Sequence, residues 1–159
     1  MLGFVRIRQY VYFSLFSEIV TAAAISEALG IYPDKVSVRG SKRINPPVPV
    51  THSWDLRSDE PGLTVDDQIE RVIHRLRPLE DQIREILASS DTKAKLQIVR
   101  YFDAEDGEQE ILDDVVSQSG EVLTKLAGQH QLLGWHLDVR TLTFLSGIGA
   151  DIDCDEYGG

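Results

Sequence analysis

Three aspartates alternate with other residues near the end of the chain: Asp151, Asp153 and Asp155. Alternate residues of a strand point to the same face, so these carboxylates would share one face. Carboxylate oxygens suit Mg²⁺ or Ca²⁺. Side chains two positions apart on a strand are roughly 6–7 Å apart, however, and the spacing lacks the EF-hand pattern. We therefore favour a solvated strand face whose charge discourages edge pairing over a metal site.

A basic cluster lies on a proline-bearing loop and consists of Arg39, Lys42 and Arg43. His52 and Trp54 follow it closely along the chain. In an acidic protein, such a cluster could dock an anion or an acidic segment of a partner. Trp54 could flank the resulting cleft, although an indole more often packs against a helix. These five residues are the predicted ligand- or partner-binding candidates.

An acidic stretch offers a second candidate surface between positions 103 and 114. Charge complementarity would speed its association with a basic partner. We predict that an acidic partner surface is formed by Asp103, Glu105, Asp106, Glu108 and Glu110.

No residue pattern of the sequence indicates catalysis. Cys154 alternates with the aspartates and should point inward, where a thiol is inert. The four histidines form no helical i, i+4 pair and no zinc spacing with the cysteine. The sequence also lacks a P-loop, a complete glycine-rich dinucleotide motif, G-x-S-x-G and H-E-x-x-H. We expect a protein that is not an enzyme and needs no cofactor.

The charge balance narrows the classes of partner. The 26 acidic residues outnumber the 16 basic ones, and the net charge is -10. This balance argues against binding to nucleic acid phosphates and to an anionic membrane surface. No apolar run approaches the ~20 residues of a membrane span, and Glu18 interrupts the stretch that resembles a signal peptide. The single cysteine cannot form an internal disulfide, so nothing indicates an oxidising compartment. We therefore expect a cytoplasmic protein.

Apolar periodicity and capping residues predict the elements that position these groups. Strands are expected at 5–16, 35–39, 51–57, 94–102, 135–137 and 150–157. Helices are expected from the Thr21 cap to Gly30, from Thr64 to 87, from 111 to 127, and from the Asp138 cap to Gly147 or Gly149. Pro78 should kink the long helix or start a second one.

Two segments share an internal spacing that suggests a repeated unit. Ile25 precedes Gly30-Ile31 as Leu142 precedes Gly147-Ile148. The expected fold is α+β with a ferredoxin-like arrangement of two strand–helix–strand halves, in which helices pack on one face of a mainly antiparallel sheet. We expect residues 1–159 to form a single domain with an acidic helical insertion at 103–131.

Short motifs occur in a characteristic order along most of the chain: Tyr12-Phe-Ser-Leu15, Ile25-Ser-Glu-Ala-Leu-Gly-Ile31 with Pro33-Asp34, Arg39-Gly-Ser41, Ser53-Trp-Asp-Leu56, the helix from Gln68 to Leu87, and Leu145-Ser-Gly-Ile-Gly-Ala-Asp-Ile-Asp-Cys-Asp-Glu-Tyr157. From about Tyr10 to Tyr157 the chain resembles the bacterial family catalogued as domain of unknown function 4279. Segments 111–131 and 45–50 depart from the pattern as an insertion and a longer proline loop. The resemblance implies a small bacterial cytoplasmic α+β domain and carries over no catalytic residue.

Three hypotheses about function follow. The first is a non-enzymatic protein-binding module, for example an immunity-type inhibitor of a basic partner. The second is a small-ligand or metal-binding domain, or an enzyme, with a cleft near Arg39, His52 and Trp54. The third is a homodimer in which the segment from Ile111 to Leu126 supplies an apolar contact, so the chain is expected to be a monomer or a homodimer.

Overall fold

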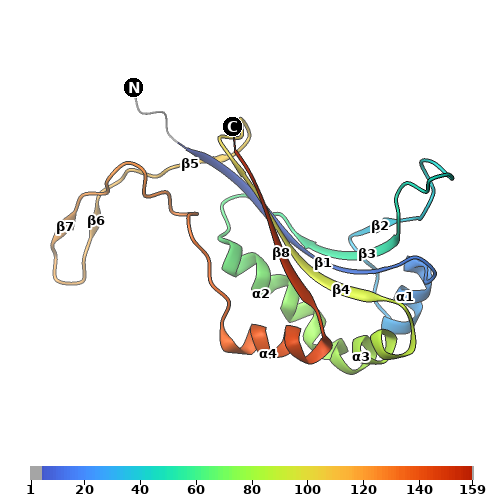
Figure 1. Ribbon diagram of the computed structural model, residues 1–159. Helices are drawn as coiled ribbons and strands as arrows, with labels where there is room; N and C mark the ends of the chain where they lie inside the picture. Colours follow the sequence, from blue (N-terminus) through green and yellow to red (C-terminus); the bar gives the residue numbers. More distant parts are fainter. Residues whose placement is uncertain (1–4, 159) are drawn as a thin grey trace.

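A single mixed sheet forms the centre of the computed structural model, which describes residues 5–158 (Figure 1). Its strand order is β2-β3-β1-β4-β8, and the short β5 pairs with the beginning of β1. The strands of this sheet are β1 (Arg6–Ser17), β2 (Lys35–Ser37), β3 (His52–Ser58), β4 (Lys93–Phe102), β5 (Glu108–Gln109) and β8 (Asp151–Tyr157).

The long strand β1 organises the sheet. It pairs antiparallel with β3 on one side and with β4 on the other, and β2 pairs antiparallel with β3. Only β8 is parallel to its neighbour, β4. The α+β class and the mainly antiparallel sheet are therefore confirmed.

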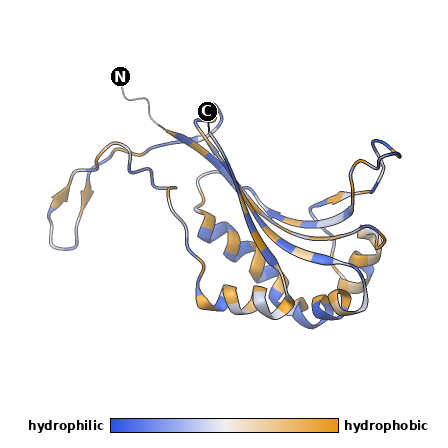
Figure 2. Ribbon diagram, viewed as in Figure 1, coloured by the Kyte–Doolittle hydropathy of each residue, from blue (hydrophilic) through white to orange (hydrophobic). Residues whose placement is uncertain are grey.

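Helices cover one face of the sheet only (Figure 1). They are α1 (Ala22–Leu29), α2 (Val65–Leu76), α3 (Glu80–Ser89) and α4 (Val139–Ile148), with the 3-10 turn η1 (Arg77–Leu79) between α2 and α3. Their apolar stripes meet Phe13, Trp54 and Leu96 of the strands in one core (Figure 2). Within residues 5–158, no helix has the length and apolar character needed to cross a membrane.

The helix ends follow the predicted capping chemistry. The Thr21, Thr64 and Asp138 side chains accept hydrogen bonds from the first turns of α1, α2 and α4. Gly30 and Gly149 end α1 and α4 at φ values of 72° and 74°, where a residue without Cβ is favoured. Pro78 lies in η1 and separates α2 from α3, because its ring cannot continue the hydrogen-bonding pattern of α2.

The helix predicted from 111 to 127 is wrong: this segment forms an arm that ends in a hairpin. Strands β6 (Val115–Val116) and β7 (Val122–Leu123) pair antiparallel. The Gly120 amide donates to the Ser117 carbonyl (2.9 Å) at a φ of 84°, which closes the turn. The β-branched valines and the turn residues outweigh the apolar spacing that suggested a helix. We call residues 111–126 the apolar arm.

The base of the apolar arm is fastened to the body. The His130 Nδ1 atom accepts from the Leu132 amide (3.0 Å), so Nε2 carries the proton and donates to the Glu108 carbonyl (2.7 Å). The Arg100 guanidinium donates to the Leu132 carbonyl (2.8 Å). The strand predicted at 135–137 is absent, because these residues run as irregular chain along α2, where the His136 amide donates to Asp66 (2.9 Å).

Candidate functional site

The face of the sheet opposite the helices is not covered by any other element of the described chain (Figure 1). Successive side chains of a strand alternate between faces. Since Val11, Phe13 and Leu15 point into the helical core, Tyr10, Tyr12, Ser14 and Phe16 point the other way. The register places Arg57 and Gln97 beside Tyr12 on this same face. We call it the open face.

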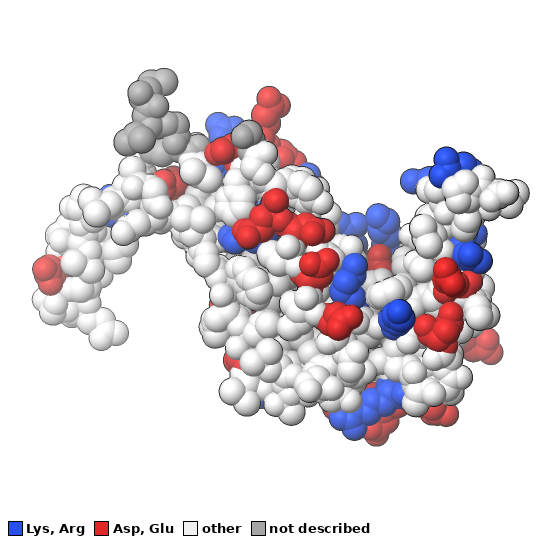
Figure 3. Space-filling model, in the orientation of Figure 1, with Lys and Arg blue, Asp and Glu red and all other residues white. Residues whose placement is uncertain are grey.

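A row of charged side chains crosses the open face. Lys35, Asp55, Ser14, Lys95 and Asp151 are successive partners on β2, β3, β1, β4 and β8. The charges alternate in sign along this row. A hollow of about 400 Å³ lies over its β2, β3, β1 and β4 members. In Figure 3, basic side chains line the depression between the projecting 40–50 loop and the middle strands.

The carboxyl group of Asp55 lies at the floor of this hollow. Asp55 is 7% exposed, and its Oδ1 atom has no hydrogen-bond partner within residues 5–158. Burial raises the pKa of Asp55, although the Ser14 hydroxyl and the charges of Lys35, Arg57 and Lys95 oppose the rise. No cation of the described chain comes within ion-pair distance of it. The hollow therefore holds an acceptor that the protein itself leaves unused.

Tyrosines and arginines are stacked across the open face. The Arg57 guanidinium lies 4.7 Å from the centre of the Tyr10 ring and 5.9 Å from that of Tyr12. Further along, the rings of Tyr101 and Tyr157 stack with centroids 5.0 Å apart, and Arg8 lies over Tyr101 at 5.8 Å. Burial raises the pKa of Tyr10 and of Tyr12, so both hydroxyls are neutral at ordinary pH. We call these six residues the Tyr–Arg cluster.

The alternating aspartates form the outer border of the open face. Asp151, Asp153 and Asp155 are exposed on the edge strand β8, where Figure 3 shows a line of acidic atoms. The Gln97 amide donates to Asp155 (3.3 Å). Within residues 5–158 no group of three or more His, Cys, Asp or Glu side chains is arranged to hold a metal ion. Cys154 points to the opposite face as predicted, and burial raises the pKa of its thiol.

The predicted acidic surface is only partly a surface. Asp103, Glu105, Asp106 and Glu108 are exposed, and Asp106 forms an ion pair with Arg8 (3.3 Å). Glu110 is 6% exposed, and its carboxylate accepts from the Gly128 amide (3.2 Å) at the base of the arm. Its placement on the partner surface was therefore wrong, because the returning chain covers it.

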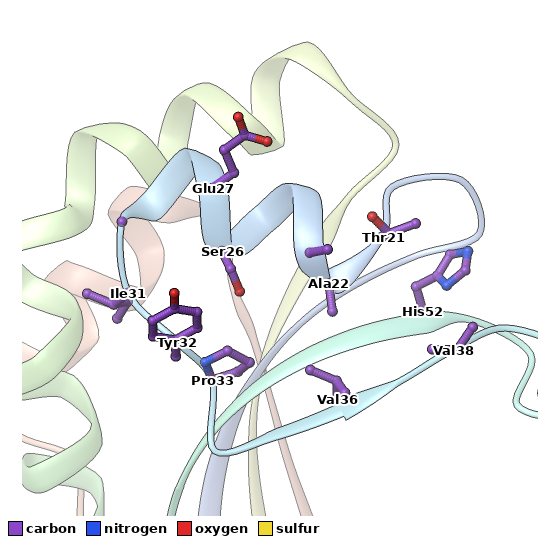
Figure 4. A pocket seen from close by; sticks show the side chains of 12 residues that line it. Thr21, Ala22, Ser26, Glu27, Ile31, Tyr32, Pro33, Val36, Val38 and His52 are labelled. Carbon is purple, nitrogen blue, oxygen red and sulfur yellow. The ribbon is translucent and has the colours of Figure 1, made fainter.

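A second concavity, of about 730 Å³, lies between α1 and β2 (Figure 4). Ala22 and Ser26 line it from the helix, and Tyr32, Val36 and Val38 line it from the opposite side. Most of these side chains are apolar. We call it the α1–β2 groove.

The cleft predicted from the basic cluster does not form as expected. His52 lines the α1–β2 groove, and its Nδ1 atom accepts from the Arg39 amide (3.1 Å). Arg39 and Arg43 donate to backbone carbonyls of their own loop, and Lys42 is exposed beside them. Trp54 is fully buried, and its indole donates to the Ser26 hydroxyl (3.1 Å). Trp54 therefore lies in the core and does not flank a cleft, in agreement with the favoured expectation that its indole packs against a helix.

Sequence reasoning missed Asp55 and the Tyr–Arg cluster. The residues of the hollow come from four strands, and their meeting depends on the register between those strands. The available signal was the alternation within β1 and β3, which places a polar or aromatic residue at every second position.

Comparison with known proteins places the chain in a family but assigns no activity. No curated protein and no solved structure matches it. The family model described as "Domain of unknown function (DUF4279)" matches residues 7–159, which is nearly the whole chain. The chain therefore belongs to the DUF4279 family.

Proposed function

We propose that the chain is a non-enzymatic protein-binding module whose recognition surface is the open face. The observation that carries this proposal is the Tyr–Arg cluster on a sheet face that no helix within residues 5–158 covers. Tyrosine and arginine are enriched among the residues that contribute most to protein–protein affinity. Stacking holds Arg57 and Tyr101 in place before binding, so less conformational entropy is lost on association.

The charges around the cluster favour a partner with a basic region. Asp151, Asp153 and Asp155 border the open face. The exposed acidic stretch from Asp103 to Glu108 lies close to the open face as well, because Asp106 forms an ion pair with Arg8 of the Tyr–Arg cluster. Charges of one sign at the border of an interface raise association rates with an oppositely charged partner. An immunity-type inhibitor of a basic protein is one form of this proposal.

The strand order supports a ferredoxin-like core within the family fold. Strands β2, β3, β1 and β4 follow the order expected when two strand–helix–strand units interlock, with α1 in the first unit and α2 to α3 in the second. The last helix, α4, leads into β8, which extends the sheet by pairing parallel with β4.

Affinity capture from native lysate tests the proposal. The immobilised protein is compared with Tyr12→Ala/Arg57→Ala on the open face, with a charge-reversed variant of the exposed acids 103–108, and with Arg140→Ala on the exposed surface of α4. We expect one protein to be retained by the wild type and by Arg140→Ala but lost from the open-face variant. Calorimetry with that purified protein should then show at least about tenfold weaker binding to the open-face variant.

Two outcomes would contradict this surface. If the open-face variant retains every protein that the wild type retains, the Tyr–Arg cluster is not the recognition surface. If only the 103–108 variant loses a partner, the acidic stretch is the surface instead. Circular dichroism of each variant controls for loss of the fold.

A second candidate is self-association through the apolar arm. Val115 and Leu123 share one face of the hairpin, and Val116 and Val122 share the other, so both faces are apolar and exposed (Figure 2). A two-stranded hairpin is marginal in water without further packing. The arm carries three acids and one lysine, whereas positions 35–43 beside the α1–β2 groove carry four cations and no acid. This complementarity favours docking of the arm into the groove of a second copy.

Mixing two variants tests this candidate directly. Val116→Asp/Val122→Asp alters the arm, Val36→Asp/Val38→Asp alters the groove, and Val139→Asp changes an exposed valine on α4. Light scattering should show a dimer for the wild type and the α4 control and a monomer for each double variant. The two double variants mixed together should re-form a dimer through their one intact contact. A monomeric wild type at high concentration, or failure of the mixture to associate, would exclude arm-to-groove docking.

A further inference from the structure

The hollow of the open face contains polar groups whose chemistry the protein does not satisfy. Asp55 Oδ1 is buried without a hydrogen-bond donor, and the Nε atom of Arg57 is buried without an acceptor, within residues 5–158. Buried polar atoms are nearly always hydrogen-bonded in folded proteins. Both atoms belong to side chains that line the same hollow. A bound molecule with a donor and an acceptor would face this carboxyl group and this guanidinium group together.

Two lysines flank Asp55, so the hollow offers both positive and negative side chains to a bound molecule. Lys35 and Lys95 lie on either side of Asp55 in the cross-strand row, Lys35 directly opposite it and Lys95 beyond Ser14. Neither forms an ion pair in the described part of the chain. A purely anionic ligand would meet the Asp55 carboxylate, and a purely cationic ligand would meet three basic side chains. A molecule that carries both charges avoids both repulsions.

Aromatic side chains complete the lining of the hollow. Tyr10, Tyr12 and Phe16 project into it from β1. Ligand sites typically combine an apolar wall with a few convergent polar groups in a volume of about 300–1,000 Å³, and this hollow has about 400 Å³. The wall suits an apolar or aromatic body attached to the charged groups.

We propose that the hollow binds a free α-amino acid with an apolar or aromatic side chain. Its ammonium group donates to Asp55, its carboxylate accepts from Lys35, Lys95 or Arg57, and its side chain lies against the rings of β1. This ligand class goes beyond protein recognition by the open face, and it is tested without any protein partner.

Isothermal titration calorimetry with three related probes tests the proposal on the purified chain. The probes are L-phenylalanine, phenethylamine, which lacks the carboxylate, and 3-phenylpropionate, which lacks the ammonium. We expect phenylalanine to bind at least about tenfold more tightly than either analogue, since each analogue loses one charge-assisted contact. Equal binding of phenylalanine and 3-phenylpropionate would show an anion site, and no heat from any probe would overturn the proposal.

Substitutions separate the two ends of the ligand. Asp55→Asn should weaken phenylalanine binding about tenfold. Binding of 3-phenylpropionate should be unaffected or tighter, because the substitution removes the Asp55 carboxylate that repels the carboxylate of this probe. Lys95→Gln should weaken phenylalanine and 3-phenylpropionate alike. Asp59→Asn and Lys42→Gln, which change exposed charges outside the hollow, serve as matched controls. An Asp55→Asn variant that binds phenylalanine as the wild type does would contradict the assigned role of Asp55.

Discussion

The two faces of the sheet are built from the same strands but differ in what their side chains do. On the covered face, Phe13, Trp54 and Leu96 pack against helices and lose all contact with water. On the open face, Tyr12, Arg57 and Lys95 meet solvent, and stacking arranges the first two. Packing explains the residue types of the covered face. Packing does not require stacked tyrosines or a buried aspartate on the open face, so we place function there.

The largest contrast between the faces is expected from neighbouring residues of β1. Phe13→Ala removes a fully buried ring from the core and should lower the free energy of unfolding by about 3–5 kcal/mol. Tyr12→Ala, one position away on the open face, should lower it by about 1 kcal/mol, because its ring is only partly buried. Urea unfolding of both variants measures the difference. Similar losses would mean that the open face also contributes to the core.

The covered face also contains a buried charged side chain, Arg100, and its removal should have the next largest effect. Arg100 is 4% exposed and donates to Gln9 Oε1 (3.1 Å), to the Leu132 carbonyl (2.8 Å) and to Glu156 (3.2 Å). Arg100→Leu leaves buried acceptors without a donor and should cost about 2 kcal/mol. It should also speed proteolysis within residues 111–131, since the base of the arm loses an anchor. Arg140→Ala is the control, and unchanged proteolysis would show that the arm is fastened by other contacts.

On the open face, Asp55→Asn should stabilise the protein at neutral pH. Because burial raises the folded-state pKa of Asp55, the folded protein binds more protons than the unfolded chain between the unfolded and folded pKa values. The stability of the wild type therefore falls as the pH rises through that window. The advantage of the asparagine variant should grow over the same window and level off above the folded pKa. Urea unfolding between pH 4 and 8 measures it, and a constant advantage at every pH would contradict the raised pKa.

The smallest effect on stability is expected from Arg57→Lys. The substitution keeps the charge but loses the planar stacking over Tyr10, and should cost about 0.5 kcal/mol of unfolding free energy. The loss of binding free energy for a protein partner should exceed this loss of stability, because lysine does not reproduce the preorganised guanidinium. Unchanged binding of the partner would indicate that the stacking serves the fold alone.

Local sequence signals predicted the elements whose ends are chemically marked. The structure contains the helices whose ends are marked by Thr21 and Gly30, by Thr64 and Pro78, and by Asp138 and Gly149. The apolar arm was missed because the spacing of Ile111, Val115, Val122 and Leu126 also fits a helix. The turn residues Ser117 to Gly120 were the better guide, since a turn interrupts any helix there.

The candidate site could not be derived in the same way. Lys35, Asp55, Ser14 and Lys95 are far apart in the sequence and meet only through the pairing of four strands. A shift of one residue in the pairing of any of these strands would turn the side chain that this strand contributes to the other face of the sheet. The basic cluster, by contrast, was visible because its members are close in sequence, yet its side chains mostly hold their own loop.

The parallel pairing of β8 with β4 has a consequence for synthesis on the ribosome. Lys95 pairs with Asp151, which is translated 56 positions later. At typical elongation rates of ~5–20 residues per second, the edge of β4 therefore waits about 3–11 s for its partner. During this interval it exposes unpaired amides and carbonyls beside Leu96 and Ile98, which is a template for strand pairing between nascent chains. The edge of β4 is therefore open to intermolecular pairing until β8 has been made.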